Sequence, residues 1–437
     1  MSFRRTAAVL AAALATLVAV PASHASARTP TTTSPEKAAA GWLARQLLDG
    51  ERLQRDGFDD QGLTIDALFA FDAAGVARDN SDKMIAWLAK PDVIEGYVTD
   101  GEGGEYPAPI AKLALAAQAQ GKDPRAFGGV DLITRLGALL DPGTGRYRDK
   151  SDYEDTSNNF GQAFAVLVLT GAGGAPAKAV DFLAGSACPD GGFPLYPGLA
   201  ECKSDVDSTG MVVQALLKAG RTEAATKALD WLVAKQTADG GFSGTPPTGT
   251  VNANSTGLAA QALRAGGRSD AATKAGEYLT GLQVGCSGEA DRRGAIPYDA
   301  TAFTPAGAVR ATPQAITGLV GVNFADLSPE GDAGPAPAPD CQTTTSTTTP
   351  TSTTTATTTA DPGTTTTDPT TTSAEDTTTT TTDEVAPVVY GGTGSTLAYT
   401  GVDVAPALWL GTLLLLAGVL TTVLARKRFT TAKERRR

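Results

Sequence analysis

The chain has 437 residues, with 36 basic and 47 acidic side chains and a formal net charge of −11. Binding to nucleic acid needs a basic face, and basic residues gather only in the tail 426–437, so nucleic acid is excluded as a partner. The one histidine, His24, lies within the first 27 residues. Once that segment is removed, catalysis by a Ser-His-Asp or Cys-His arrangement is excluded as well.

The N-terminal segment 1–27 has the three parts of a signal peptide. Arg4 and Arg5 precede an apolar run from Ala7 to Val20, and Ala25-Ser26-Ala27 follows it. A charged start, an apolar stretch and small residues at the cleavage site are typical of an exported precursor. The sequence therefore predicts export, with residues 28–35 as a short linker.

Residues 36–329 contain an internal repeat, which predicts a repeat fold. An aromatic residue followed by Leu recurs at intervals of 45 to 50 residues, which makes six units. The pairs are Trp42-Leu43, Trp87-Leu88, Phe182-Leu183, Trp231-Leu232 and Tyr278-Leu279, with Leu132-Ile133 in the third unit.

Each unit has the same order of elements. A helical stretch that carries the pair is followed by a Gly-rich turn, such as Asp239-Gly240-Gly241-Phe242, and by a second Ala- and Leu-rich stretch. Asp207-Ser208-Thr209 and Asn254-Ser255-Thr256 mark the start of two second stretches, and Thr312-Pro313 marks the last. We predict an all-α domain of six helix pairs, about twelve helices. This repeat is consistent with a closed ring or an open solenoid.

Four cysteines lie in the exported part of the chain. An even number in an oxidising compartment predicts two disulfides, for which three connectivities exist. We expect local pairing, Cys188 with Cys202 and Cys286 with Cys341. The first pair brackets the Asp190–Phe193 turn, and the second holds the C-terminal extension on the sixth unit.

The composition of the C-terminal quarter of the chain predicts a stalk followed by a membrane span. Of the 40 residues in 343–382, 26 are Thr, so residues 330–386 are predicted to form a disordered Thr/Pro-rich stalk, whether or not it is glycosylated. Residues 404–425 carry no charge and are long enough for one transmembrane helix. The basic tail 426–437 belongs in the cytoplasm, which places the body outside the cell.

The repeats resemble those of the prenyltransferase and squalene-cyclase superfamily. Gln236 with Asp239-Gly240-Gly241-Phe242 is similar to the Q-x-x-D-G-[GS]-[WF] element of that group. The resemblance covers residues 36–329 and implies an (α/α)6 toroid, in which six inner helices are ringed by six outer ones.

Region 387–403 resembles a sortase sorting signal. Leu397, Ala398, Tyr399, Thr400 and Gly401 fit the L-A-x-T-G variant, just before the apolar span and the basic tail. The resemblance implies a sortase as partner, cleavage after Thr400 and attachment to peptidoglycan, after a precursor stage in the plasma membrane. A permanent C-terminal membrane anchor is the alternative.

Candidate catalytic residues are few. Asp205 and Asp207 lie in Asp205-Val206-Asp207-Ser208-Thr209, which is similar to the D-x-D-D-T acid motif of class II terpene cyclases but has Ser208 in place of the third Asp. Because the next unit has Asn252 and Asn254 at the matching places, we interpret these residues as helix caps. The zinc site of the related prenyltransferases needs a histidine and cannot form.

Two loop features remain. Five acidic residues between Asp141 and Asp155 are the oxygen ligands that Ca²⁺ prefers, but their spacing differs from an EF-hand and basic residues are interleaved. We interpret this segment as a solvated loop and predict no metal or cofactor. Tyr153 and Tyr196 fall in the turns that a toroid gathers at one end, where they are candidates for a ligand-binding mouth, whereas Phe193 and Phe242 are expected to plug their own repeats.

Three functions follow from these features. The first is a non-catalytic surface module, anchored to the cell wall, that binds a small or apolar ligand or a glycan. The second is an enzyme, similar to a terpene cyclase or prenyltransferase or acting on a glycan, with Asp205 and Asp207 in its cavity. The third is an architectural surface protein. Fold alone does not decide between them.

Overall fold

The computed structural model describes residues 29–244 and 249–342. The predicted signal peptide, most of the stalk, the sorting signal Leu397–Gly401 and the apolar span 404–425 lie outside these residues. Within 29–244 and 249–342, none of the helices has the length and hydrophobicity of a membrane span.

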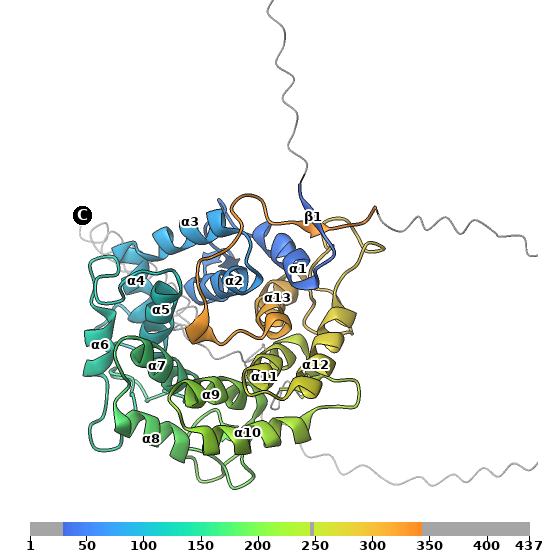
Figure 1. The fold of residues 1–437 in the computed structure, drawn as a ribbon. Helices are drawn as coiled ribbons and strands as arrows, with labels where there is room; N and C mark the ends of the chain where they lie inside the picture. The colour runs from blue at the N-terminus through green and yellow to red at the C-terminus, as the bar shows by residue number, and fades with distance from the viewer. Residues whose placement is uncertain (1–28, 245–248, 343–437) are drawn as a thin grey trace, which may run out of the picture.

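The described residues form a closed ring of two concentric layers of helices, an (α/α)6 toroid (Figure 1). The inner layer comprises α2 (Gln61–Ala74), α5 (Pro107–Ala119), α7 (Asn159–Gly171), α9 (Val206–Lys218), α11 (Ala253–Ala265) and α13 (Pro305–Val320). The outer layer comprises α1 (Pro35–Ala44), α3 (Arg78–Leu88), α6 (Leu132–Ala138), α8 (Ala177–Gly185), α10 (Thr222–Lys235) and α12 (Ser269–Leu282). The predicted six helix pairs are confirmed, because each outer helix carries the repeated apolar pair.

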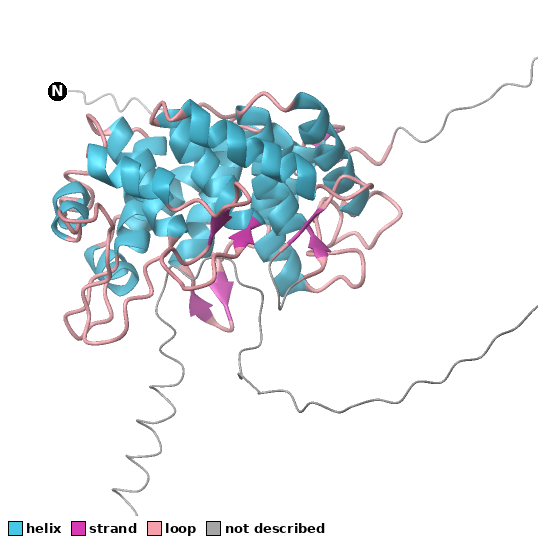
Figure 2. Ribbon diagram, turned by 90° about the horizontal axis from the view of Figure 1, so that it is seen from below, coloured by secondary structure: helices cyan, strands magenta, loops and turns pink. Residues whose placement is uncertain are grey.

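One further helix and four short strand pairs complete the described part. Helix α4 (Pro91–Val98), which the repeat does not predict, lies between α3 and α5. The strands pair as β1 (Thr31–Thr32) with β8 (Ala338–Pro339), β2 (Gln54–Arg55) with β3 (Phe58–Asp59), β4 (Phe193–Pro194) with β5 (Ser204–Asp205), and β6 (Phe242–Ser243) with β7 (Val251–Asn252). The pairs that belong to the repeat turns lie at one end of the ring (Figure 2).

Two glutamines, each at the end of an outer helix, join neighbouring units of the ring. Gln236 at the end of α10 donates from Nε2 to the Gly240 carbonyl, at 2.9 Å, and to Ala271 of α12, at 2.8 Å. Gln283 at the end of α12 donates in the same way to Gly294, at 3.0 Å, and to Pro35 of α1, at 2.8 Å. The sixth unit therefore contacts the first as the fifth contacts the sixth. This contact closes the ring.

The turn glycines are required by both backbone conformation and space. Gly240 has φ of +91°, and a Cβ there would lie 2.3 Å from the Lys274 carbonyl oxygen. Gly294 has φ of +94°, and a Cβ would lie 2.4 Å from the Ala38 oxygen of α1. The sixth turn differs from the DGGF pattern in sequence. Its Gly294 nevertheless approaches the backbone of α1 as closely as Gly240 approaches the backbone of α12, so this contact joins the last unit to the first.

We expect Gly294→Ala to open or strain the closure. Left-handed strain and a backbone clash together should lower the free energy of unfolding by about 2–5 kcal/mol. Gly137→Ala in α6 is the matched control, because Gly137 is exposed, has no neighbour near its Cβ position and should gain up to about 1 kcal/mol from the alanine. Urea unfolding of both variants measures the difference. Equal stability of the two would show that the Gly294 contact does not hold the ring together.

The chain after α13 returns across the ring as an ordered strap, residues 321–342 (Figure 1). It enters the centre of the ring, where Phe324–Asp326 form the short helix η1, and then passes over α1 to the β1–β8 pair. The disulfide Cys286–Cys341 fastens its end, and Cys188–Cys202 brackets the fourth turn, so both predicted pairings are confirmed. The folded domain therefore extends past the boundary at residue 329.

A candidate binding site in the ring lumen

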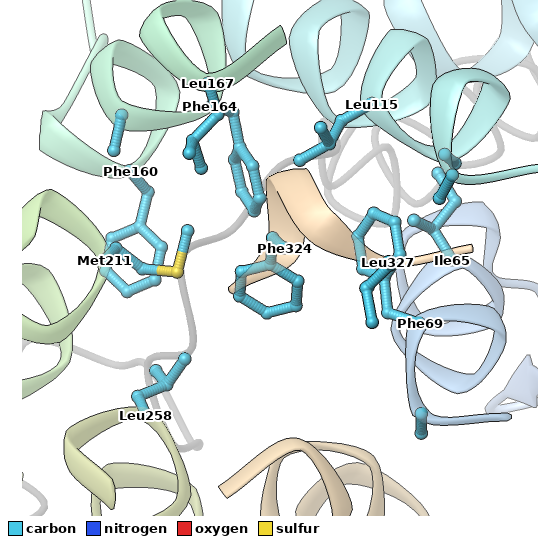
Figure 3. Close-up of a cluster of buried hydrophobic side chains, with 14 of the residues drawn as sticks. Ile65, Phe69, Leu115, Phe160, Phe164, Leu167, Met211, Leu258, Phe324 and Leu327 are labelled. Atoms are coloured by element: carbon cyan, nitrogen blue, oxygen red, sulfur yellow. The ribbon is translucent and has the colours of Figure 1, made fainter. Parts of the chain in front are cut away.

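The space enclosed by the six inner helices is here called the lumen, and its end at their N-termini is called the mouth. Apolar side chains from several inner helices point into the lumen in Figure 3. They include Ile65, Phe69, Leu115, Phe160, Phe164, Leu167, Met211 and Leu258. All of them are buried, so this layer forms a packed apolar ring.

The strap closes the lumen from the end opposite the mouth. The ring of Phe324 in η1 lies 5.1 Å from that of Phe69 and 6.3 Å from that of Phe164. Its backbone N–H donates to Oε1 of Gln214, at 3.2 Å. Lys218 at the end of α9 pairs with Asp326, at 2.5 Å. The C-terminal strap therefore packs into this end of the lumen, and Phe324 forms what is here called its floor.

Two polar residues, Asp207 and Asn254, lie one helical turn nearer the mouth than Met211 and Leu258 and are here called the polar layer. Residues three or four apart share a helix face, so Asp207 lies above Met211 on α9 and Asn254 above Leu258 on α11. On the far side of the lumen, Lys112 and Asp66 follow their helix N-caps by six residues instead of two, so this pair lies about one turn deeper, at the level of Met211 and Leu258.

Asp205, and not Asp207, caps helix α9. The Asp205 side chain accepts a hydrogen bond from the Ser208 N–H at 2.7 Å, and Asn252 accepts from Ser255 at 2.9 Å. The capping interpretation is thus confirmed for Asp205 and wrong for Asp207, which belongs to the first turn of the helix. Likewise Thr304, not Thr312, caps α13, and Pro313 lies inside that helix.

Thr312 has a different role, which it shares with two threonines that the sequence analysis assigned to start signals. Thr209, Thr256 and Thr312 accept hydrogen bonds from the backbone N–H groups of Phe193, Phe242 and Ile296, at 2.8, 2.9 and 3.1 Å. These bonds fix each turn on its inner helix. Phe193 and Phe242 are fully buried, so their predicted role as plugs is confirmed.

Asp207 is a buried carboxyl group with an unsatisfied oxygen. Its side chain is 7 % exposed, and Oδ1 has no hydrogen-bond partner among the described residues. Burial, followed by repulsion from the Asp205 carboxylate, raises the pKa of Asp207 to about 8, against a hydrogen bond with Ser255 that lowers it. Asp207 therefore holds its proton at neutral pH in the ligand-free protein.

Asn254 occupies the equivalent position on the neighbouring inner helix. Its amide Nδ2 donates to Oε1 of Gln314 on α13, at 2.6 Å. Its Oδ1 is buried and lacks a hydrogen-bond partner in the described part of the chain, and the side chain is 4 % exposed. Two adjacent inner helices thus each present one unsatisfied oxygen.

Lys112 and Asp66 form an ion pair that the sequence analysis missed. Lys112 Nζ lies 2.7 Å from Asp66 Oδ1, donates to the Gly62 carbonyl at 3.0 Å and lies 6.0 Å from the centroid of the Phe164 ring. Burial raises the pKa of Asp66, against the lowering effect of Lys112. The Asp66 side chain keeps 19 % of its surface exposed, so solvent reaches this carboxylate. The available signal was a single lysine in the otherwise uncharged stretch 107–119.

The two tyrosines proposed for the mouth lie on exposed turns. Tyr153 is 65 % exposed and donates from its hydroxyl to Glu102 Oε2, at 3.1 Å, and Tyr196 is 43 % exposed. Each precedes an inner helix, so both stand at the mouth end of the ring. Whether they contact a ligand stays a prediction.

The acidic loop 141–155 is held by local contacts. Asp149 Oδ2 accepts from the N–H and the hydroxyl of Thr156, at 2.9 and 2.8 Å, and Asp155 pairs with Arg148 at 3.0 Å. Within the described residues, no group of three or more acidic, histidine or cysteine side chains is placed to hold a metal ion.

Comparison with known proteins gives similarity at the level of solved structures. No model of a protein family and no curated protein matches the chain. A type II terpene cyclase, MstE from Scytonema, is 13% identical over 65% of this chain and 96% of its own, with a TM-score of 0.49. An unsaturated glucuronyl hydrolase from Bacillus sp. GL1 is 14% identical over 66% and 98%, with a TM-score of 0.48. A protein from Actinoplanes is 17% identical over 66% and 99%, with a TM-score of 0.47.

Proposed function

We propose that the chain is a non-catalytic binding module displayed at the cell surface, and that its lumen holds a small ligand. The observation that carries the proposal is the pair of buried, unsatisfied oxygens of Asp207 and Asn254, which lie above a closed apolar floor. The strap occupies the lower part of the lumen, so the bound molecule lies between the polar layer and the mouth.

The energetic cost of these two oxygens supports a binding role. A buried polar atom without a partner costs about 1–3 kcal/mol. Most buried polar groups in folded proteins are therefore satisfied, and exceptions call for an explanation. A ligand that donates hydrogen bonds to Asp207 and Asn254 would remove this cost when it binds.

The residues around Asp207 argue against the alternative of an enzyme that protonates an alkene. Such an acid must stay protonated and still be a strong donor, which needs neighbouring groups tuned around it. Burial keeps the proton on Asp207, but Ser208 stands where the D-x-D-D-T motif has its third Asp, and Asn254 occupies the equivalent position on the neighbouring helix. These residues therefore favour hydrogen bonding by Asp207 over proton transfer from it.

Native mass spectrometry of the full-length protein in a neutral detergent tests the binding role. We expect the wild type to carry a small-molecule adduct that is absent from the double variant Asp207→Leu, Asn254→Leu. The change removes both unsatisfied oxygens, but also the partners of Gln314 Oε1 and of the Ser255 hydroxyl, so urea unfolding must first show that this variant is folded. Asp181→Asn, a change at a carboxylate 60% exposed on α8, is the control and should keep the adduct. An adduct that survives in the double variant, or a wild type without one, would contradict the proposal.

We further propose that a sortase attaches the protein to peptidoglycan through Thr400. The support is the order of Leu397–Gly401, apolar span and basic tail in the sequence. Thr400→Ala should abolish attachment and leave the uncut chain in the membrane. The measurement is cell fractionation after muramidase digestion. Wild-type protein that only detergent extracts would show instead that residues 404–425 are the permanent anchor.

A further inference from the structure

The lumen already contains one buried ammonium group, and its surroundings define what such a group needs. Lys112 Nζ is held by the Asp66 carboxylate at 2.7 Å and by a carbonyl oxygen, that of Gly62, at 3.0 Å. The Phe164 ring lies 6.0 Å away on the neighbouring helix α7. A carboxylate, an amide oxygen and an aromatic face thus compensate the loss of water around this cation.

The same three kinds of group recur around Asp207. The carboxyl of Asp207 and the amide oxygen of Asn254 stand at equivalent positions of adjacent inner helices, and each has one buried oxygen with no partner in the described residues. Phe160 occupies the matching position of α7, on the other side of α9, and belongs to the same buried cluster as Met211 (Figure 3). The Asn254 oxygen calls for a hydrogen-bond donor, and so do both Asp207 oxygens once that carboxyl gives up its proton.

The charges around this position favour a cation. The charged group that acts on the Asp207 carboxyl is Asp205, whose repulsion a positive ligand would relieve. Ser255 of α11 contributes a neutral hydroxyl. The positive groups of the lumen act elsewhere, because Lys112 pairs with Asp66 and Arg310 interacts with Asp60 and Asp66. The net charge of −11 also attracts cations toward the protein.

We infer that the ligand of the lumen is a small molecule that carries a protonated amine, with the ammonium between Asp207 and Asn254 and an aliphatic body beside Phe160. This inference rests on the proposed binding function and adds the chemical class of the ligand. On binding, Asp207 loses its proton to solvent and becomes the carboxylate partner of the ammonium. Charge and protons balance, because one proton is released for each amine bound.

Titration with n-hexylammonium, with 1-hexanol as its neutral counterpart, tests the inference. The full-length protein is used in phosphate buffer, since Tris is itself an amine. We expect calorimetry to show hexylammonium binding, and Asp207→Asn to weaken it about 30-fold or more, as loss of one partner of a buried charge pair does. Asp181→Asn should bind like the wild type. At pH 6.5, a pH indicator in weakly buffered solution should record release of about one proton per ligand in the wild type alone.

The outcomes separate the ligand class from the site. Equal affinity in Asp207→Asn, no proton release, or no hexylammonium binding would each overturn the amine assignment. If 1-hexanol binds the wild type but not the double variant Asp207→Leu, Asn254→Leu, the lumen remains the binding site and the ligand class is wrong.

Discussion

Replacement of Asp207 by Asn is expected to make the protein more stable, and increasingly so as the pH rises. The pKa of Asp207 is about 8 in the folded chain and 3.8 as its ordinary value. Between these values the folded protein keeps a proton that the unfolded chain loses, so the free energy of unfolding falls as the pH rises from 4 to 8. Asn does not titrate, so the variant does not lose this part of its free energy of unfolding as the pH rises. The gain should be about 1–2 kcal/mol at pH 5 and several kcal/mol at pH 8.

Urea unfolding of wild type and Asp207→Asn across this pH range measures the effect. The variant should keep a smaller slope in the same direction, because burial also raises the pKa of Asp72 to about 8. Asp181→Asn, an exposed change, should stay within about 0.5 kcal/mol of the wild type at each pH. If Asp207→Asn were no more stable at pH 8 and had the wild-type slope, Asp207 would not be a buried, protonated acid. If Asp207→Asn is more stable than the wild type but no longer binds the amine, the Asp207 carboxyl serves binding at a cost in folding stability.

Removal of the Phe324 ring should have the largest destabilising effect of any single change in the strap. Phe324 is 5 % exposed and packs against Phe69 and Phe164 at the centre of the ring. Phe324→Ala should lower the free energy of unfolding by about 3–5 kcal/mol, because it removes apolar contacts and leaves a cavity in the floor of the lumen. The measurement is urea unfolding of the full-length protein.

The control and a second readout identify the cause. Phe58→Ala removes the same ring from a side chain that is 70 % exposed, and it should change stability little. An apolar cavity in the floor should also bind benzene, which would raise the melting temperature of Phe324→Ala and not that of the wild type. A loss below about 1 kcal/mol would mean that η1 is not packed as a floor.

The repeat made most of the fold predictable from the sequence. The apolar pairs gave the six outer helices, since each pair buries the same face of its helix against the inner layer. The Q-x-x-D-G element reflects the contacts of Gln236, and Gln283 repeats them at the closure. The local disulfide Cys188–Cys202 followed from its position around one turn. Helix α4 was not predictable because it stands outside the repeat.

The site was less predictable because it depends on contacts between distant residues. Asp205 and Asp207 are the same residue type two positions apart, so the sequence does not show which of them caps the helix. Only the backbone of α9 shows that the cap is Asp205. The pair of Lys112 and Asp66 joins two units and leaves no short motif. The floor is formed by Phe324, which follows the last repeat and has no periodic pattern. The resemblance to known repeats therefore predicted the ring of helices. It could not predict the strap that fills one end of its lumen.

A crystal structure of the protein as purified, at a resolution that shows bound molecules, tests the central claim most directly. We predict electron density for a small molecule between the polar layer and the mouth, with donors within hydrogen-bond distance of Asp207 Oδ1 and Asn254 Oδ1, above a floor closed by Phe324. A lumen that contains only water molecules around these two oxygens, or a ligand bound outside the ring, would contradict the account.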